Sequence, residues 1–301
     1  MKLKILTWNL NFFYDNWYER IKSINKVLEK EIESNDIIVL QEATIPLVKS
    51  IDAIFDCLKS PLVNCTPHYT FSDEIKTTID KVTSYFPKKQ LEIQYILKFM
   101  MDKFFGLVSW TFSHFGNTFQ YLYFEFPIVW CFLFVTIIPI FLICGYTFLG
   151  MMVIVNKKIK TVVKSKFVGR LFQYSQFIFN NKKILLCNLH LNEASDTKGY
   201  KELMKIISFT KKTPHDILIL AGDFNASPTS TVYKYLTDNG FKSVIKEKHN
   251  KDIKTWPALN PQSCIDYIWF KGEDIEICSA SIFGNALNTD HKGVKCCLDI
   301  K

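Results

Sequence analysis

The sequence predicts an α/β protein built around short buried strands. A first apolar run at residues 3–8 leads into an amphipathic helical pattern and then into a second apolar run at 36–42. Apolar runs and helical patterns alternate again after residue 150, which is typical of α/β folds. Polar residues stand where several of these runs end, and α/β proteins place their sites at the carboxyl ends of strands.

The first unit is expected to be a strand, a helix and a strand. In the stretch WYERIKSINKVLEKEIESN, Ile21, Ile24 and Leu28 recur at helical spacing between charged residues, which predicts an amphipathic helix. The next run, DIIVLQE, is compact and apolar, as expected for a strand buried on both faces, and it ends in Glu42.

The second half of the chain repeats this alternation. The predicted strands are GMMVIVN, LFQYSQFIFN, KILLCNLHL, DILILAGDFN, CIDYIWF and VKCCLDI, and the predicted helices are GYKELMKIISFTKK and STVYKYLTDNG. Polar residues end several of these strands, at Glu42, His190, Asp223 and Asn225, and Asp266 lies within another strand. We therefore expect these side chains to share one site.

Composition sets the wider limits. With 301 residues, of which 48% are hydrophobic, the chain can bury one large core, so we expect one domain with an insertion. The net charge of +8 suits nucleic acid, an anionic membrane face or plain solubility. The nine cysteines form no CxxC pair, so we expect reduced thiols in a cytosolic setting. The N-terminus predicts a strand and not a signal peptide.

The stretch LAGDFNASP is the most specific short motif. An apolar strand runs into Gly222, a tight turn presents Asp223 and Asn225, and Pro228 restricts the exit. Taken alone, the stretch fits an Asx-rich turn equally well. Other motifs in the same chain favour the functional interpretation.

Six ordered motifs resemble the endonuclease/exonuclease/phosphatase superfamily: TWNLN at 7–11, VLQE at 39–42, NLHLN at 188–192, LAGDFN at 220–225, CIDYIWF at 264–270 and TDH at 289–291. The resemblance covers about 1–70 and 150–301. It implies a four-layer α/β sandwich, in which two packed mixed β-sheets are flanked by helices. It also implies a phosphoesterase that uses Mg²⁺, with Mn²⁺ as an alternative.

The resemblance assigns roles to ten residues. It implies metal ligands at Asn9, Glu42 and Asp290, catalytic residues at His190, Asp223, Asn225, Asp266 and His291, and substrate-binding residues at Arg170 and Asn192. These residue types suit the chemistry, because a phosphodiester is anionic and its hydrolysis needs charge neutralisation, an activated water and a proton donor. Each residue alone also has a structural explanation, such as a turn cap or a surface ion pair, and only the joint pattern favours catalysis.

An insertion separates the two parts of this predicted domain. Residues 71–149 are extra relative to the family pattern, and two segments within them, about 104–124 and 127–149, are strongly apolar. A helix of 23 residues reaches about 34 Å, enough to cross a hydrocarbon core of about 30 Å. Five lysines between 157 and 166 fit a cytosolic membrane flank or, alternatively, an ordinary strand with a wet face.

A single crossing would place Asn9 and Glu42 on one side of the bilayer and Asp223 on the other. We therefore expect either a helical hairpin, turning at residues 125–127, or a re-entrant segment kinked at Pro139. Both keep the catalytic domain on one membrane face, predicted to be the cytosolic one.

The favoured functional prediction is a phosphodiesterase that acts on membrane lipid head groups and resembles neutral sphingomyelinases, with the bilayer as its partner. The alternative is a membrane-anchored nuclease acting on DNA or RNA, although no basic tract interleaved with aromatics marks a nucleic-acid groove. The HLN motif disfavours abasic-site repair, and no inositol 5-phosphatase signature is present. A noncatalytic scaffold is disfavoured because the Asp, Asn and His residues of the motifs are all present, although Cys264 stands where the family often has a basic residue.

Overall fold

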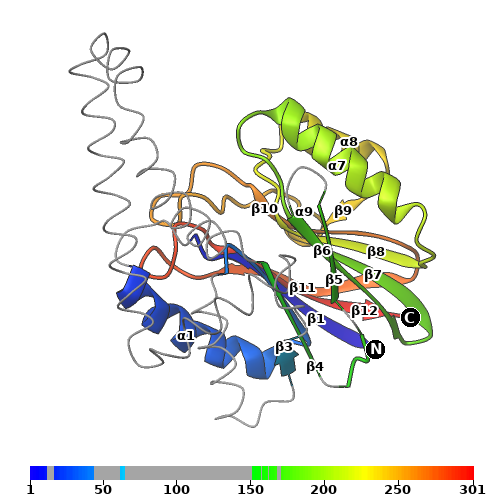
Figure 1. The fold of residues 1–301 in the computed structure, drawn as a ribbon, viewed down its shortest axis with the longest axis horizontal. Helices are drawn as coiled ribbons and strands as arrows, with labels where there is room; N and C mark the ends of the chain where they lie inside the picture. The colour runs from blue at the N-terminus through cyan, green and yellow to red at the C-terminus, as the bar shows by residue number, and fades with distance from the viewer. Residues whose placement is uncertain (12–16, 44–61, 65–150, 157, 162, 168–170) are drawn as a thin grey trace, which may run out of the picture. The chain divides into compact units, whose positions relative to one another are not determined.

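In the computed structural model, two six-stranded β-sheets pack face to face, with helices on their outer sides (Figure 1). The structure describes residues 1–11, 17–43, 62–64, 151–156, 158–161, 163–167 and 171–301. Helix α1 (Trp17–Ser34) lies outside one sheet, while α7 (Asp196–Thr210) and α8 (Thr231–Asp238) lie outside the other. The predicted α/β sandwich of two mixed sheets is confirmed.

Sheet A has the strand order β11-β12-β1-β2-β4-β3. The β1–β2 pair is parallel and the other pairs are antiparallel. The strands are β1 (Lys2–Asn9), β2 (Ile37–Gln41), β3 (Leu62–Asn64), β4 (Met151–Asn156), β11 (Ile275–Phe283) and β12 (Gly293–Ile300).

Sheet B has the strand order β5-β6-β7-β8-β10-β9, and its β7–β8 pair is parallel while the other pairs are antiparallel. The strands are β5 (Val163–Phe167), β6 (Leu171–Phe179), β7 (Lys182–His190), β8 (Ile217–Asp223), β9 (Lys242–Ser243) and β10 (Asp266–Lys271). The short helix α9 (Val244–His249) follows β9 directly.

The helices form where the sequence alternates apolar and charged residues at helical spacing. Ile24, Leu28 and Ile32 of α1 are buried at four-residue intervals, which gives this helix a continuous apolar stripe. Leu203 and Ile206 of α7 pack with outward-facing residues of sheet B. The N-terminus of α7 is capped by Ser195, whose hydroxyl accepts a 3.3 Å hydrogen bond from the backbone N–H of Lys198.

Alternate residues of the central strands face the space between the sheets. In four strands these inward positions change from apolar to polar toward the carboxyl end, in the series Leu3-Ile5-Thr7-Asn9, Ile37-Val39-Gln41, Ile184-Leu186-Asn188-His190 and Ile217-Ile219-Ala221-Asp223. The apolar members form the core between the sheets. The polar members collect at one end of that core, because both parallel strand pairs end there.

Four strands are additional to the strands that the sequence predicted outright, namely β3, β5, β9 and β11. The lysine-rich stretch is a strand over Val163–Phe167, as one of its two interpretations expected, with Lys164 and Lys166 exposed. Strands β3, β9 and β11 were not predicted: β3 and β9 have only three and two residues, and β11 is interrupted by a bulge between Ile277 and Ser279.

The insertion lies outside the described residues. By its internal contacts the chain divides into two units, Met1–Thr70 with Leu149–Lys301, and Phe71–Phe148. The predicted membrane segments 104–124 and 127–149 are not among the described residues, so the insertion and its boundaries stay a prediction. Across the part of the chain that the structure describes, no helix combines the length and apolar character that crossing a membrane requires.

Candidate active site

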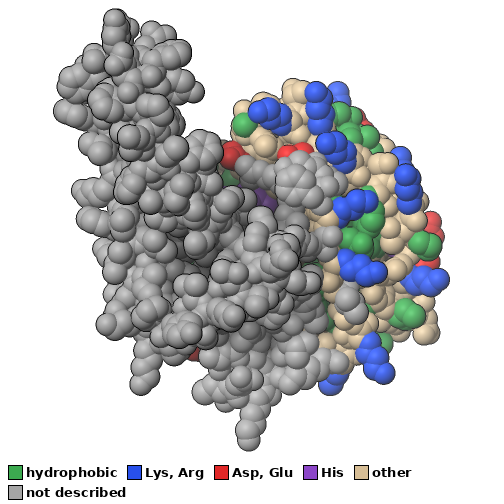
Figure 2. Space-filling view, viewed as in Figure 1, with side chains coloured by type: hydrophobic (Ala, Val, Ile, Leu, Met, Phe, Trp, Pro, Cys, Tyr) green, Lys and Arg blue, Asp and Glu red, His purple; other side chains and the backbone are tan. Residues whose placement is uncertain are grey.

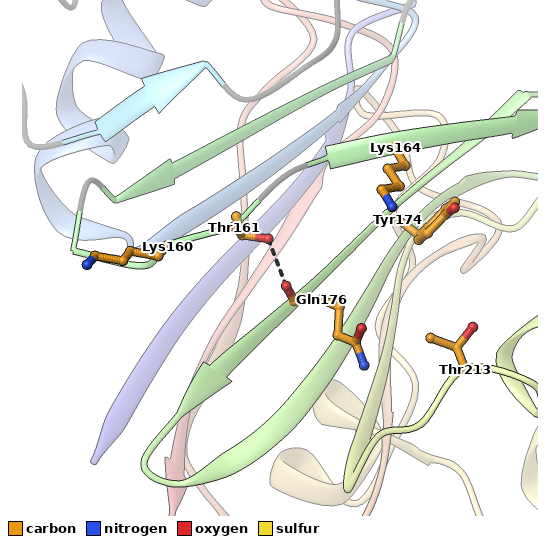
Figure 3. A pocket seen from close by; sticks show the side chains of 6 residues that line it. All are labelled: Lys160, Thr161, Lys164, Tyr174, Gln176 and Thr213. Carbon is orange, nitrogen blue, oxygen red and sulfur yellow. Dashed lines mark hydrogen bonds between the residues drawn. The ribbon is translucent and has the colours of Figure 1, made fainter.

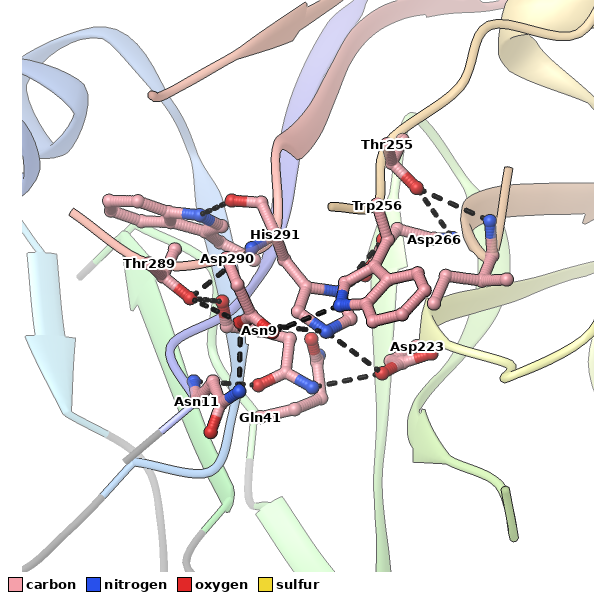
Figure 4. Close-up of polar contacts among 12 residues, drawn as sticks. Asn9, Asn11, Gln41, Asp223, Thr255, Trp256, Asp266, Thr289, Asp290 and His291 are labelled. Carbon is pink, nitrogen blue, oxygen red and sulfur yellow. Dashed lines mark hydrogen bonds and ion pairs between the residues drawn. The ribbon is translucent and has the colours of Figure 1, made fainter. Parts of the chain in front are cut away.

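The polar end of the inter-sheet core holds a cluster of carboxylates, amides and histidines, and Figure 4 shows the part of it around Asn9, Asp223 and His291. Asn9 ends β1, Glu42 follows β2, His190 ends β7 and Asp223 ends β8. Loop residues Asp290 and His291 precede β12, and Asp266 begins the antiparallel strand β10, directly opposite Asp223. The structure therefore brings together seven of the ten residues that the sequence singled out.

Asp223 lies at the centre of this cluster. It is 1% exposed, and its Oδ2 accepts a 2.9 Å hydrogen bond from Nδ2 of Asn9 across the two sheets. Burial raises the pKa of the Asp223 carboxyl above its usual value, and nearby Asp266 adds to the rise. A carboxylate that holds its proton more tightly than usual is suited to accept one at neutral pH.

Gly222 explains the close approach of β7 and β8 just before Asp223. Its φ of +148° is a conformation that other residues rarely adopt, and a Cβ there would lie 1.9 Å from the backbone oxygen of Leu189. The glycine of the AGDFN motif is therefore required by packing, and it fixes the position of the aspartate that follows.

His291 and Asp266 form a buried pair. Nδ1 of His291 lies 3.0 and 3.1 Å from the two carboxylate oxygens of Asp266, which accept a hydrogen bond from its N–H. Burial alone would lower the pKa of His291, but the charges of Asp266 and Asp223 outweigh it and raise the pKa to about 10. At neutral pH this ring is a charged donor, and its Nε2 lies 3.8 Å from Asp223 Oδ2.

Asn9, Glu42 and His190 form the side of the cluster next to sheet A. Asn9 Nδ2 also donates to Glu42 Oε1 at 3.3 Å, and His190 Nε2 lies 3.7 Å from the same oxygen and 3.8 Å from Asp223 Oδ2. Burial raises the pKa of Glu42 to about 7, although the hydrogen bond from Asn9 opposes the rise. The backbone of Glu42 has a φ of +51°, a strained conformation that is common where side chains are held for function.

Asp290 is held by two residues that the sequence analysis did not select. Asn11 Nδ2 donates to its Oδ1 at 2.8 Å, and the indole N–H of Trp256 donates to its Oδ2 at 2.9 Å (Figure 4). Asn11 was visible in the TWNLN motif, two positions after Asn9, and Trp256 lies in a loop more than thirty residues from Asp290. No local pattern pairs that tryptophan with the aspartate.

A buried amide layer lies below the cluster and joins the two sheets. Gln41 Nε2 donates to Asn188 Oδ1 at 2.6 Å, and Asn188 Nδ2 donates to Gln173 Oε1 at 3.2 Å. Gln41 also contacts Thr7 at 3.1 Å. Gln41 directly precedes Glu42, and Asn188 is the inward-facing residue of β7 before His190. The layer therefore fixes the spacing of the two sheets beneath the site.

The other three predicted residues have different surroundings. Asn225 donates its backbone N–H to Asp223 Oδ1 at 2.8 Å, while its side chain donates to Leu191 O at 3.0 Å. Asn192 Oδ1 accepts from Ala194 N within its own loop. Arg170 lies outside the described residues. Roles for Arg170 and Asn192 in substrate binding stay predictions.

The cluster fits a divalent cation. Asn9, Glu42 and Asp290 offer the oxygen atoms that hard cations prefer, and the raised pKa of Glu42 reflects buried negative charge that a cation would offset. A second group, Asp223, Asp266 and His291, has potential ligand atoms within 4.8 Å of one another. We favour the first set, because His291 is paired with Asp266 and protonated, whereas a ligating histidine must be neutral.

A two-sheet sandwich with acids and histidines at the strand ends defines a class of metal-dependent phosphoesterases. Residues 6–291 match the Endonuclease/Exonuclease/phosphatase family, and the chain belongs to it. The predicted superfamily is therefore confirmed, and the protein is a metal-dependent hydrolase of this type. No curated protein sequence matches the chain.

Solved structures share the fold at low sequence identity. TDP2 from D. rerio, complexed with a single-strand DNA product, aligns with a TM-score of 0.60 at 13% identity over 99% of each chain. A functionally unknown conserved protein from Enterococcus faecalis aligns with a TM-score of 0.61 at 12% identity, over 99% of this chain and 100% of that one. An endonuclease/exonuclease/phosphatase from Bacteroides vulgatus gives 0.59 at 12% identity over 100% of both chains. These likenesses show the fold alone.

Proposed function

We propose that the protein hydrolyses a phosphodiester in membrane lipid head groups, using Mg²⁺, from the cytosolic face of a membrane. The observation that carries the reaction type is the inter-sheet cluster of Asn9, Glu42, Asp223 and His291, joined by contacts of 2.9 to 3.8 Å. It combines an acceptor for the proton of water, a charged donor for the phosphate and oxygen ligands for a cation.

Asp223 is the proposed general base. Its raised pKa suits proton uptake from a water, and Asn9 and the backbone N–H of Asn225 fix its two oxygens at 2.9 and 2.8 Å. His291, oriented by Asp266, donates a hydrogen bond to a phosphate oxygen. His190 lies on the other side of Asp223 and donates toward the phosphate or leaving oxygen.

Asn9, Glu42 and Asp290 would hold the cation. A bound Mg²⁺ supplies charge neutralisation for the phosphate and for the leaving oxygen. The hydrogen bonds from Asn11 and Trp256 keep Asp290 in one orientation before any ligand arrives.

Two features support a lipid substrate. Leu259 and Leu287 are 82% and 77% exposed, and Trp256 is 39% exposed while contacting Asp290. The backbone N–H of Ala258 donates to the carbonyl of Asp290 at 2.7 Å, so the loop of Leu259 is tied to the site. Exposed aliphatic and indole groups beside a site suit a membrane interface, as does the apolar insertion at 104–149.

The alternative is a nuclease. The observation that favours it is the structural likeness to D. rerio TDP2, whose structure contains a single-strand DNA product. The net charge of +8 would suit either substrate.

One comparison tests both proposals. The full-length protein is offered sphingomyelin vesicles, phosphoinositide vesicles, DNA and RNA, with Mg²⁺ and with Mg²⁺ removed by chelation. We expect lipid turnover that Asp223→Asn and His190→Ala each reduce by about 10²-fold or more. Asp238→Asn, an exposed change on α8, is the matched control and should leave activity unchanged.

The outcomes separate substrate from mechanism. Cleavage of DNA or RNA without lipid turnover would overturn the lipid proposal and favour the nuclease. Wild-type activity in Asp223→Asn on the best substrate would instead overturn the proposed base. Full activity after chelation would exclude the metal requirement.

A further inference from the structure

A cavity apart from the catalytic cluster opens on the outer face of sheet B, next to its edge strand β5. Its volume is about 720 Å³, and its lining residues are Lys160, Thr161, Lys164, Tyr174, Gln176 and Thr213 (Figure 3). Tyr174 and Gln176 alternate along β6 with Gln173 and Ser175, which are buried on the face toward sheet A. The cavity, here called the lysine groove, is therefore on the opposite side of sheet B from the inter-sheet core.

The lysine groove carries positive charge with no acidic lining residue. Lys160 and Lys164 are exposed, as are Lys158 and Lys166 nearby in the chain and Lys211 and Lys212 just before Thr213. Among the described residues, the lysines in ion pairs with carboxylates are Lys182, Lys295 and Lys301, and none of them lines the groove. Figure 2 shows many lysine and arginine side chains and few acidic ones on the visible described surface.

The lysines around the groove are more than the C-terminus of the neighbouring helix α7 needs to balance its partial negative charge. Helix α7 ends at Thr210, and its C-terminus carries about half an elementary negative charge. Lys211 and Lys212 are enough to offset that charge. Lys160 and Lys164 come from the other wall of the groove, and they remain available to an anionic ligand.

The neutral polar groups of the lining are largely engaged with the protein. The hydroxyl of Thr161 donates to Gln176 O at 3.1 Å, the amide of Gln176 donates to Pro214 O, and the hydroxyl of Thr213 donates to Phe209 O at 3.3 Å. The ammonium groups of Lys160 and Lys164 and the hydroxyl of Tyr174 are therefore the donors offered to a ligand. In Figure 3 Lys160 lies at one end of the groove, with its ammonium group directed outward, and Lys164 lies with Tyr174 at the other end.

We propose that the lysine groove binds a small ligand that carries two or more phosphate groups, such as a phosphorylated polyol. Two lysines at opposite ends suit a ligand with separated anionic groups, and lysine binds phosphate as a point charge. The volume falls in the range of about 300–1,000 Å³ that is common for small-ligand sites. A nucleic acid is less favoured, because one aromatic ring, Tyr174, lines the groove, whereas single strands need successive rings for stacking.

The test uses the full-length protein and two sources of the same chemistry. Inositol hexakisphosphate is the soluble probe in calorimetry, and phosphatidylcholine vesicles with and without phosphatidylinositol bisphosphate are the lipid probe in flotation. The groove variant is Lys160→Glu with Lys164→Glu. The control is Lys201→Glu with Lys205→Glu, which makes the same charge change at two exposed positions of α7.

We expect the groove variant to lose about tenfold or more in affinity for inositol hexakisphosphate, and the control about threefold or less. Both variants should hydrolyse bis(p-nitrophenyl) phosphate as the wild type does, which separates this proposal from the proposed catalytic function. If the glutamates unfold the protein, alanine at both positions replaces them.

If the groove variant loses affinity for inositol hexakisphosphate but still floats with the phosphatidylinositol bisphosphate vesicles, the ligand is a free phosphorylated molecule. If it loses vesicle binding to the same extent, the ligand is a lipid head group. Equal losses in groove and control variants, or no binding of either probe by the wild type, would overturn the proposal. An oligonucleotide that binds through Lys160 and Lys164 while both phosphate probes fail would overturn it as well.

Discussion

The indole N–H of Trp256 donates a 2.9 Å hydrogen bond to Oδ2 of Asp290, at the edge of the catalytic cluster. Asn11 donates to the other oxygen of the same carboxylate at 2.8 Å. Two neutral donors thus orient Asp290 while leaving its negative charge in place. This arrangement suits a carboxylate that serves as a metal ligand, since partners of the ligands tune metal affinity.

Trp256→Phe should weaken metal binding at this carboxylate. The change keeps an aromatic ring and removes the donor to Asp290, so we expect the Mg²⁺ concentration for half-maximal activity to rise about tenfold or more. Trp269→Phe is the control, because the buried indole N–H of Trp269 has no hydrogen-bond partner among the described residues. An equal rise in both variants would show that ring size, and not the hydrogen bond, is responsible.

Asp266→Asn should move the alkaline limit of activity toward neutral pH. The charge of Asp266 is the first contribution that raises the pKa of His291, which reaches about 10 against the opposing effect of burial. Without it the ring loses its proton at a lower pH, and we expect turnover at pH 8 to fall by about 10²-fold or more. The rate–pH profile measures this, with Asp252→Asn, whose carboxylate contacts Tyr233, as the control. An unmoved alkaline limb would contradict the pairing.

Glu42→Gln should stabilise the metal-free protein above neutral pH while impairing catalysis. Burial raises the pKa of Glu42 from 4.5 to about 7, so the folded state holds this proton more tightly than the unfolded state does. Ionisation of the buried Glu42 therefore lowers the free energy of unfolding. This loss is absent below pH 4.5, grows as the pH rises to about 7, and then stays at about 3 kcal/mol.

Chemical denaturation in EDTA at pH 4 and pH 8 measures this difference. We expect the two proteins to agree at pH 4, and the variant to have the higher free energy of unfolding at pH 8. Glu273→Gln, at an exposed position, should match the wild type at both. Equal stabilities of wild type and Glu42→Gln at pH 8 would contradict the raised pKa.

The sequence was sufficient to predict the strands that carry the site. Asn9, Glu42, His190 and Asp223 stand where an apolar run ends, and the alternation of strand residues turns Asn9, His190 and Asp223 toward the space between the sheets. Glu42 comes directly after the inward-facing Gln41 and lies outside β2, so alternation does not predict its direction. The parallel pairing of β1 with β2 and of β7 with β8 then brings two carboxyl ends of strands together in each sheet. These features are local in sequence, so their pattern is visible without coordinates.

The contacts that orient the site could not be predicted in this way. Trp256 with Asp290, and Asn9 with Asp223, are hydrogen bonds between side chains 34 and 214 positions apart. Their partners depend on how loops close and how two sheets pack, and neither leaves a periodic pattern in the sequence. The same reason hid the amide layer, whose members each resemble an isolated polar residue in an apolar strand.

That amide layer gives the last prediction. Asn188 is 1% exposed, accepts from Gln41 at 2.6 Å and donates to Gln173 at 3.2 Å. Asn188→Leu leaves both partners buried without it, and an unsatisfied buried polar group costs about 1–3 kcal/mol. We therefore expect the free energy of unfolding to fall by about 2–4 kcal/mol.

Replacing the whole layer should cost less than breaking it. In the triple variant Gln41→Met, Gln173→Met and Asn188→Leu, no amide of the layer is left buried without its partner amide. The carbonyls of Leu40 and Met152 lose Asn188 in both variants, so they do not affect the comparison. Thr7 and the carbonyl of Met151 lose a donor in the triple variant alone, and we expect this variant to recover about 1 kcal/mol relative to Asn188→Leu. Urea denaturation of the single and triple variants measures the difference. A triple variant less stable than Asn188→Leu would mean that packing, and not hydrogen bonding between Gln41 and Asn188, holds the sheets together beneath the site.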